Sequence, residues 1–338
     1  MQCLSRALGR HAPSRLLALP SQAASAPGVS CFRAAPVARV STAAVAAAKG
    51  AALAKKARRH GRSAQRKLPG RRAAEEVADG GGGPGVDGLS QSLRRALERF
   101  GAEVARPDEE INLAYAASLL AQHADPAMDP EATVLQPLAA LGEEFKRRLA
   151  QGAGEGAAEG AGDADLPEHL RLYRRAAALC AFMDASGFAG CPRTEEGYYD
   201  ADNSRMDRVL QRRRGIPITL SLAYMEVGRA GGLELKAMNF PGHFLLRFGD
   251  AESAGLVDAF TNRVFSEEEA AAYLSALYGQ PIQLDPSWRT SPNLSKVLFL
   301  LRMVRNLQNV YNRSGNVSQA VQVVQYARRL EAVAGMTS

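Results

Sequence analysis

The sequence predicts an α+β protein that is mainly helical and carries a small antiparallel sheet. Three observations support this fold class. Apolar residues recur at helical spacing over most of residues 89–187. Between residues 233 and 258 the pattern changes to short apolar or alternating runs, which are typical of strands. Two further helical patterns, separated by Gly315, lie near the end of the chain. We therefore expect a helical N-terminal segment, a core of helix and sheet, and a C-terminal helical hairpin.

Residues 1–72 are predicted to be a transit peptide followed by a basic tail, both without fixed structure. The first 74 residues hold 15 lysines or arginines, no acidic residue and many alanines and serines, which is typical of a peptide that directs import into an organelle. The remaining chain holds 27 basic and 35 acidic residues, so the overall charge of +7 comes from this segment. We expect a chloroplast location, with the mitochondrion as the alternative. The apolar runs of this segment are too short to span a membrane, and no membrane association is expected.

A dense basic run lies within this tail, at residues 55–72. Such a run can attract nucleic acid electrostatically, although it is more often a solvated tail. Nucleic-acid binding through these residues therefore stays an alternative. Residues 73–88 include the stretch DGGGGPGVDG and are predicted to be a flexible linker, so the folded part should begin near Leu89.

Residues 89–190 form the predicted N-terminal helical region. One apolar stripe runs along its first helix and comprises Leu89, Leu93, Leu97 and Phe100. Asp129 is a plausible N-cap for a later helix, and Pro137 should kink or split that helix. Residues 152–165 are a low-complexity acidic insertion that we leave without structure. A further helix is expected over Pro167–Ala185.

Two cysteines, Cys180 and Cys191, lie outside the predicted transit peptide. They match no CxxC or Cys/His spacing, so no metal site is predicted, and no cofactor motif was found. Cys180 falls on the apolar face of the helix over Pro167–Ala185 and is expected to be a buried, small apolar residue.

Residues 191–285 form the predicted core. A short helix is expected over Ser204–Gln211, and a longer helix over Pro217–Arg229, where Pro217 suits the first helical position. Three strands should follow, at Leu233–Asn239, His243–Phe248 and Leu256–Asp258. This order places a histidine and an aspartate on successive strands beside a helix.

Four stretches carry a resemblance to a known family. RRGIPITLS is followed by NFPGHFLLRF, then by VDAF and, nearer the C-terminus, by LLRMVRNLQNVY. In order and spacing these stretches resemble the SirB family of transglutaminase-like proteins, which occurs in bacteria and in plant and algal plastids. The resemblance extends from about Ile111 to the C-terminus, interrupted by residues 152–165. It implies a transglutaminase/papain-like core behind an N-terminal helical segment, often followed by tetratricopeptide-type helices.

The resemblance also implies a catalytic arrangement that this chain has in part. His243 falls on the histidine position of the superfamily triad, and Asp258 on the aspartate that orients it. The triad cysteine should lie at the start of the helix beginning near Pro217, where the helix dipole and free N–H groups favour a thiolate. No cysteine follows Cys191 in the chain.

Thr219 and Ser221 are candidates for an exchanged nucleophile, because a hydroxyl beside a positioned base can replace a thiol. In the alternative interpretation Thr219 caps the first turn of the helix and Ser221 packs in the core. His243 and Asp258 would then survive as a structural pair. Cys191 is a further candidate, although its position does not match the triad.

Three arginines, Arg212, Arg213 and Arg214, precede this helix and form a possible anion-binding edge. They are alternatively paired with nearby acids such as Asp207 and Glu196.

Residues 286–338 are predicted to form a helical hairpin with tetratricopeptide-like spacing. Because one such unit cannot bury its own apolar faces, it should pack on the core. Three functions then remain open: a non-catalytic binding or scaffold protein with a protein partner, a hydrolase or acyltransferase that uses Thr219 or Ser221, and a nucleic-acid-associated protein.

Overall fold

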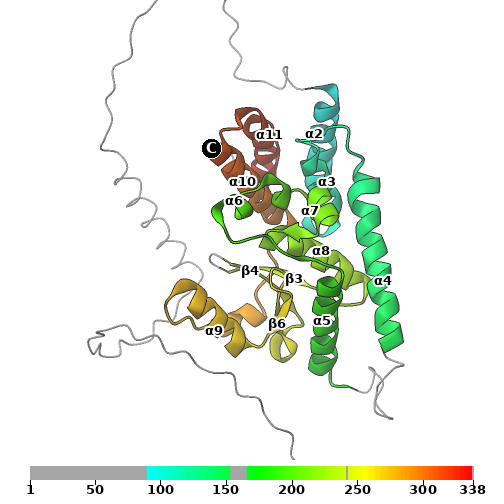
Figure 1. Cartoon of the computed structure of the whole chain (residues 1–338), viewed down its shortest axis with the longest axis vertical. Coiled ribbons are helices and arrows are strands. Elements are labelled where there is room, and N and C mark those ends of the chain that lie inside the picture. The colour runs from blue at the N-terminus through cyan, green and yellow to red at the C-terminus, as the bar shows by residue number, and fades with distance from the viewer. Residues whose placement is uncertain (1–89, 153–165, 241–242, 337–338) are drawn as a thin grey trace, which may run out of the picture. The chain divides into compact units, whose positions relative to one another are not determined.

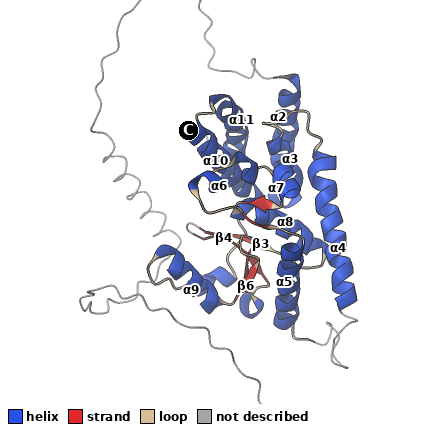
Figure 2. Ribbon diagram, viewed as in Figure 1, coloured by secondary structure: helices blue, strands red, loops and turns tan. Residues whose placement is uncertain are grey.

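The computed structural model describes residues 90–152, 166–240 and 243–336. The predicted transit peptide, basic tail and linker, and nearly all of the predicted insertion, lie outside these residues. The described part contains helices α2 to α11, a two-stranded sheet and a four-stranded antiparallel sheet (Figures 1 and 2). The predicted α+β class, mainly helical with a small antiparallel sheet, is therefore confirmed. Among the described helices, none has both the length and the apolar character needed to cross a membrane.

The N-terminal half of the described part is helical. Its elements are α2 (Gln91–Val104), a 3-10 turn (Asp108–Glu110), α3 (Leu113–Ala121), α4 (Gln136–Gly152) and α5 (Glu168–Ala185). Three residues of the predicted stripe, Leu93, Leu97 and Phe100, are buried as expected, and the fourth, Leu89, lies outside the described residues. The Ser90 hydroxyl caps this helix by accepting a hydrogen bond from the Leu93 N–H at 3.2 Å. Helix α3 is apolar on nearly all sides, which suits its position between α2 and the C-terminal helices.

Pro137 splits a helical pattern as predicted. Residues Glu131–Leu135 form a π-helical turn, and α4 begins directly after it at Gln136. The Gln136 N–H bonds to the Glu131 carbonyl, five residues earlier. A proline ring clashes with the carbonyl four residues before it in a regular α-helix, and the wider π turn is the local change that accommodates Pro137. Asp129 accepts a hydrogen bond from the Glu131 N–H at 3.0 Å, close to its predicted capping role.

The middle of the chain begins with short elements and ends in a long helix. These elements are β1 (Ala189–Gly190), α6 (Glu195–Tyr198), a 3-10 turn (Ala201–Ser204), α7 (Met206–Arg212), β2 (Arg214–Gly215) and α8 (Pro217–Ala230). Strands β1 and β2 pair in parallel and were not predicted, because two residues give no sequence pattern. The helix predicted from Ser204 begins instead at Met206, since the preceding residues already form the 3-10 turn. Helix α8 matches its predicted bounds to within one residue, with Pro217 at its first position.

Four strands form the antiparallel sheet in the order β3 (Lys236–Phe240), β4 (His243–Phe248), β5 (Gly255–Asp258) and β6 (Arg263–Phe265). The first predicted strand was placed too early, at Leu233. In the structure the Leu233 N–H bonds to the Gly228 carbonyl at 2.8 Å, so Leu233 closes the end of α8 and the strand begins three residues later. Strand β6 was not predicted, because its three residues give no clear sequence pattern.

The C-terminal part consists of α9 (Glu267–Tyr278), a 3-10 turn (Pro286–Arg289), α10 (Lys296–Ser314) and α11 (Val317–Val333). Helices α10 and α11 form the predicted hairpin, and Gly315 ends α10 with a φ of 68°. The hairpin packs on α2, where the rings of Phe100 and Tyr326 meet edge to face at 4.9 Å between centroids. Its tetratricopeptide-type classification stays a prediction.

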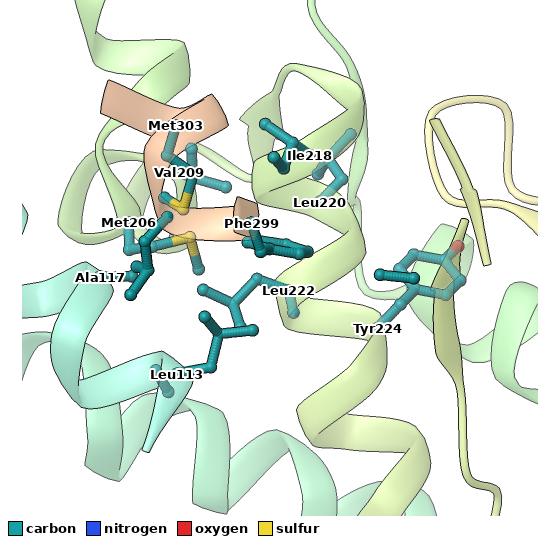
Figure 3. Close-up of a cluster of buried hydrophobic side chains, with 14 of the residues drawn as sticks. Leu113, Ala117, Met206, Val209, Ile218, Leu220, Leu222, Tyr224, Phe299 and Met303 are labelled. Carbon is teal, nitrogen blue, oxygen red and sulfur yellow. The ribbon is translucent and has the colours of Figure 1, made fainter. Parts of the chain in front are cut away.

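Helix α8 lies in the main hydrophobic core. Figure 3 shows side chains of α8 meeting Leu113 and Ala117 from α3, Met206 and Val209 from α7, and Phe299 and Met303 from α10. The sheet separates this core from a second one: Phe244, Leu246 and Phe248 of β4 join the main core, whereas Leu245 packs with α9 and Trp288. Packing of α3, α7 and α10 in this common core therefore fixes the position of α8 relative to β4.

Candidate functional site

The start of helix α8 is held by the loop that precedes α7. The Ile216 N–H donates to the Asn203 carbonyl at 3.3 Å, and the Thr219 hydroxyl donates to the same carbonyl at 2.8 Å. Pro217 supplies a φ angle that suits the first helical turn. A side chain at Gly215 would lie 2.7 Å from the Thr219 hydroxyl oxygen, so only glycine allows this close approach. These contacts fix where the first turn of α8 lies.

His243 and Asp258 are brought together by the pairing of β4 with β5. Leu246 is opposite Val257 in this pair, and extending the register places Asp258 diagonally opposite His243 on the same face. The His243 Nε2 lies 3.3 Å from the Asp258 Oδ2, with 6% and 0% of the two side chains exposed. Neither ring nitrogen makes an aligned hydrogen bond with a described residue. The Tyr273 ring of α9 meets the imidazole edge to face at 5.3 Å between centroids.

Asp258 is held by the turn that follows β5. Its Oδ1 accepts a hydrogen bond from the Phe260 N–H at 2.9 Å, and its Oδ2 accepts one from the Thr261 hydroxyl at 2.8 Å. Burial acts to raise the pKa of Asp258, but the contacts with His243, Thr261 and Phe260 outweigh it and hold the pKa below its usual value. The carboxylate is therefore ionised at neutral pH and can orient the imidazole.

A cavity of about 50 Å³ lies in front of His243. One wall is the start of α8, with Ile216, Pro217 and Ile218. The remaining walls come from α6, β4 and α10, through Tyr198, Phe244, Arg302 and Asn306. The space holds a few water molecules or one small chemical group. Because Nε2 faces Asp258, Nδ1 is the ring nitrogen left for a group in the cavity.

The family of the chain follows from comparison with known proteins. A sequence model described as the transglutaminase-like superfamily matches residues 132–305, slightly more than half of the chain. The chain belongs to the transglutaminase-like superfamily. The match includes α8, both site strands and Arg302 of α10, and it ends one residue before Asn306.

Relatives of this transglutaminase-like chain occur in animals and bacteria. It is 38% identical to F-box only protein 21 of mouse and of human over 141 residues, which are 38% of this chain and 20% of those proteins. It is 30% identical to a UPF0162 protein of Xylella fastidiosa over 142 residues, which are 40% of this chain and 47% of that protein. For the UPF0162 protein of Pseudomonas aeruginosa the identity is 28% over 162 residues, 48% of this chain and 57% of that protein. The chain thus spans about a fifth of the F-box proteins and about half of the bacterial ones. No solved structure matches it at a significant level.

In the transglutaminase-like site no thiol or hydroxyl from the start of α8 lines the cavity beside His243. Pro217 and Ile218 occupy the cavity wall where the superfamily resemblance places a cysteine. Thr219 is fully buried, and its hydroxyl donates to main-chain carbonyls rather than capping the helix. Ser221 is also fully buried, and its hydroxyl has no hydrogen-bond partner among the described residues. Neither hydroxyl lines the cavity beside His243.

Both cysteines outside the predicted transit peptide are buried, and neither lines the cavity. Burial raises the pKa of Cys180 to about 12, which agrees with the predicted role of this residue in the core. Burial also raises the pKa of Cys191 to about 11. Both thiols therefore stay protonated and weakly nucleophilic at neutral pH. In the described part no group of three or more His, Cys, Asp or Glu side chains could hold a metal ion.

The three arginines that precede α8 are already engaged. Arg212 lies 2.7 Å from a carboxylate oxygen of Asp200 and 3.3 Å from one of Asp202. Arg213 and Arg214 donate hydrogen bonds to main-chain carbonyls just after α5. Pairing with acids is therefore observed for Arg212, although with other acids than those expected from the sequence. This arrangement does not favour an anion-binding edge.

Sequence reasoning missed Arg302, Asn306 and Tyr198 as site residues. Arg302 and Asn306 are four residues apart in LLRMVRNLQNVY, so they lie on one face of α10. That spacing was visible in the sequence. However, nothing local showed that this face meets the start of α8, about 85 positions earlier in the chain.

Proposed function

We propose that this transglutaminase-like chain is a plastid form of the SirB family that has lost its cysteine nucleophile and acts as a binding or scaffold protein for a protein partner. One observation carries the proposal. Pro217 and Ile218 form the wall of the cavity beside His243 where a reactive thiol would have to lie.

The remaining groups suit binding better than covalent catalysis. An acyl-enzyme or thioester intermediate requires a nucleophile within hydrogen-bond reach of the imidazole. Among the described residues no serine, threonine or cysteine hydrogen-bonds to His243, and the Thr219 hydroxyl is held by Asn203. The pair of His243 and Asp258 can still orient a ring nitrogen towards a bound group, which is a recognition role.

The proposal predicts no nucleophile-dependent turnover. We expect the full-length chain to hydrolyse neither amide nor ester probes and to transfer no acyl group to amines. Iodoacetamide should leave partner binding unchanged, because both described thiols are buried and protonated. Turnover is measured with chromogenic esters and glutamine-containing peptides, and binding by capture of the partner once it is identified.

Matched variants separate this proposal from the hydrolase alternative. Thr219→Val removes the hydroxyl at nearly constant volume, and Thr219→Ser retains it. Ser221→Ala and His243→Ala complete the set, with folding checked by circular dichroism. Hydrolysis that is lost in His243→Ala and in either Thr219→Val or Ser221→Ala, with folding intact, would establish a hydroxyl-nucleophile hydrolase and refute the binding proposal.

The location is proposed from composition alone. We expect residues 1–72, fused to a fluorescent protein, to direct it into plastids, because this segment is basic, lacks acids and is rich in alanine and serine. The same fusion with its arginines changed to glutamine is the control and should stay in the cytosol. Signal confined to mitochondria or the cytosol for the unchanged segment contradicts the proposal. Cleavage after residue 72 would remove the basic run and with it the nucleic-acid alternative.

A further inference from the structure

The cavity in front of His243 contains a cation without an acidic partner. Arg302 of α10 is half-buried, and its guanidinium lies over the Phe244 ring at 5.1 Å from the centroid. It forms no ion pair with a described carboxylate, and the acidic groups that influence its pKa are the phenols of Tyr198 and Tyr278, which are uncharged at neutral pH. Burial lowers its pKa. A desolvated cation without a counter-charge is costly, which indicates that an anion takes this place when a ligand is bound.

Two further polar groups lie at or beside the same space. Ile216 is the N-cap of α8 and supplies no side-chain hydrogen bond. The N–H groups of Ile218 and Thr219 therefore have no acceptor among the described residues, and the helix dipole favours negative charge at this end. His243 is 94% buried, and while its Nε2 lies 3.3 Å from Asp258, its Nδ1 makes no hydrogen bond with a described residue. The ring lines the cavity, so its Nδ1 is available to a ligand group.

A second cation lies close to the cavity. Arg193 stacks over the Phe260 ring at 5.0 Å and donates a hydrogen bond to the Tyr273 hydroxyl at 3.1 Å. It has no ion pair with a described carboxylate. The positive charges of Arg193 and Arg302 both act to lower the pKa of Tyr198, which lines the cavity. Asp258 beside His243 is ionised, and its single negative charge does not balance the two guanidinium charges of Arg193 and Arg302.

We propose that this cavity binds the carboxylate group of a ligand, paired with Arg302 and accepting hydrogen bonds from the start of α8. Asn306, one turn after Arg302 on the same face of α10, lines the cavity and adds an amide donor. The Nδ1 of His243 completes the set of polar groups. This inference rests on the proposed binding function and names the chemical class of the ligand.

The size of the cavity favours a carboxylate over a larger anion. About 50 Å³ accommodates a few waters, so only the end of a ligand fits and the rest must extend outward. A planar carboxylate matches the fork of a guanidinium in two parallel hydrogen bonds. Such a group is available at the C-terminus of a peptide or on a small organic acid.

The test follows the His243 ring directly. The chain contains five histidines, so labelling them with ¹³C at the Cε1 position gives a simple spectrum in which His243→Gln assigns the signal of interest. Four probes are titrated into the full-length protein: an acetylated alanine tripeptide with a free carboxylate, the same peptide as its C-terminal amide, propionate, and inorganic phosphate. We expect the two carboxylates to shift the His243 signal and the amide to have no effect. Tighter binding of the tripeptide than of propionate would identify a peptide C-terminus as the source of the carboxylate.

Variants of α10 provide the matched control. Arg302→Gln should weaken carboxylate binding by about tenfold or more, because the charge-assisted pair is lost, whereas Arg302→Lys should weaken it less. Arg305→Gln removes the same charge from an exposed position of the same helix and should leave binding unchanged. Thermal unfolding verifies that each variant folds, and the unpaired position of Arg302 predicts a midpoint for Arg302→Gln no lower than that of the wild type.

Three results would overturn the proposal: equal binding of the amide peptide, binding of phosphate without carboxylates, or unchanged affinity in Arg302→Gln. The proposal would also be overturned if none of the probes shifted the His243 signal at high concentration. Turnover by the wild type would refute the binding function, yet would leave carboxylate binding by Arg302 standing as recognition of the product. The proposed binding function and the proposed carboxylate site can therefore be refuted independently of each other.

Discussion

Asp258→Ala is expected to lower the free energy of unfolding by about 2 to 4 kcal/mol. The reason is structural: the carboxylate accepts the Phe260 N–H and the Thr261 hydroxyl and lies beside His243. Its removal leaves the Phe260 N–H without an acceptor in a buried turn, and each such unsatisfied group costs about 1 to 3 kcal/mol. Urea unfolding followed by circular dichroism measures the change.

Asp258→Asn and Glu252→Ala are the controls for this variant. Asparagine retains an acceptor for the Phe260 N–H and should lose less than alanine does. Glu252 is an exposed acid in the neighbouring loop, and its removal should change stability by less than about 0.5 kcal/mol. His243→Ala should cost about 1 to 3 kcal/mol, towards the lower end because its contact with Asp258 is not an aligned hydrogen bond. An Asp258→Ala protein as stable as the wild type would show that the carboxylate does not hold the turn.

Stability should also fall by about 3 kcal/mol as the pH is lowered from about 6.5 to 4, because of His123. This residue is 1% exposed and contacts the Leu120 carbonyl through Nδ1 and the Tyr311 hydroxyl through Nε2, each at 2.7 Å. A neutral ring that donates from Nδ1 and accepts at Nε2 satisfies both contacts. Burial lowers its pKa from 6.5 to about 4. The unfolded chain therefore binds a proton in this range that the folded chain does not, so stability is full above pH 6.5 and is lost as the pH falls.

The measurement compares urea unfolding at about pH 7 and about pH 4.5, and because carboxyl groups also begin to titrate near pH 4.5, the contribution of His123 is taken as the difference between the wild type and His123→Gln. In His123→Gln the loss between these values should largely disappear, although the variant is less stable at pH 7. His169→Gln changes an exposed histidine and should retain the wild-type pH dependence. Equal losses in the wild type and in His123→Gln would exclude His123 as the cause.

Much of the fold was predictable because the elements that carry it have strong local signals. Helix α8 begins at Pro217 and ends before two glycines, and both are positions at which these residues suit a helix boundary. Strand β4 was predicted with its observed bounds. The strand before it was placed too early because Leu233 and Leu235 are apolar for a different reason: both are buried in the link after α8. Burial alone does not distinguish a strand from a well-packed link.

The site was predictable only where the family-like motifs lie on it. His243 and Asp258 were identified from those stretches, and the pairing of β4 with β5 brings the two together. Arg302 and Asn306 were not identified, because their role depends on how α10 packs against α8 and β4. Arg212 to Arg214 were considered instead, since a run of like charges is conspicuous in a sequence. Their partners, such as Asp200 for Arg212, are set by the folded loop.

The sequence by itself determined the order and type of the main elements, the histidine and aspartate on successive strands, and the absence of a cysteine after Cys191. These are properties of local pattern and composition, which periodicity and spacing report directly. Only the tertiary structure decided which side chains surround the imidazole. It tied Thr219 to Asn203, left Pro217 and Ile218 at the cavity, and brought an unpaired Arg302 to the same place. The physical reason is that a side chain's hydrogen bonds and counter-charges come from neighbours far away in the chain, whose positions are fixed by packing of the common core.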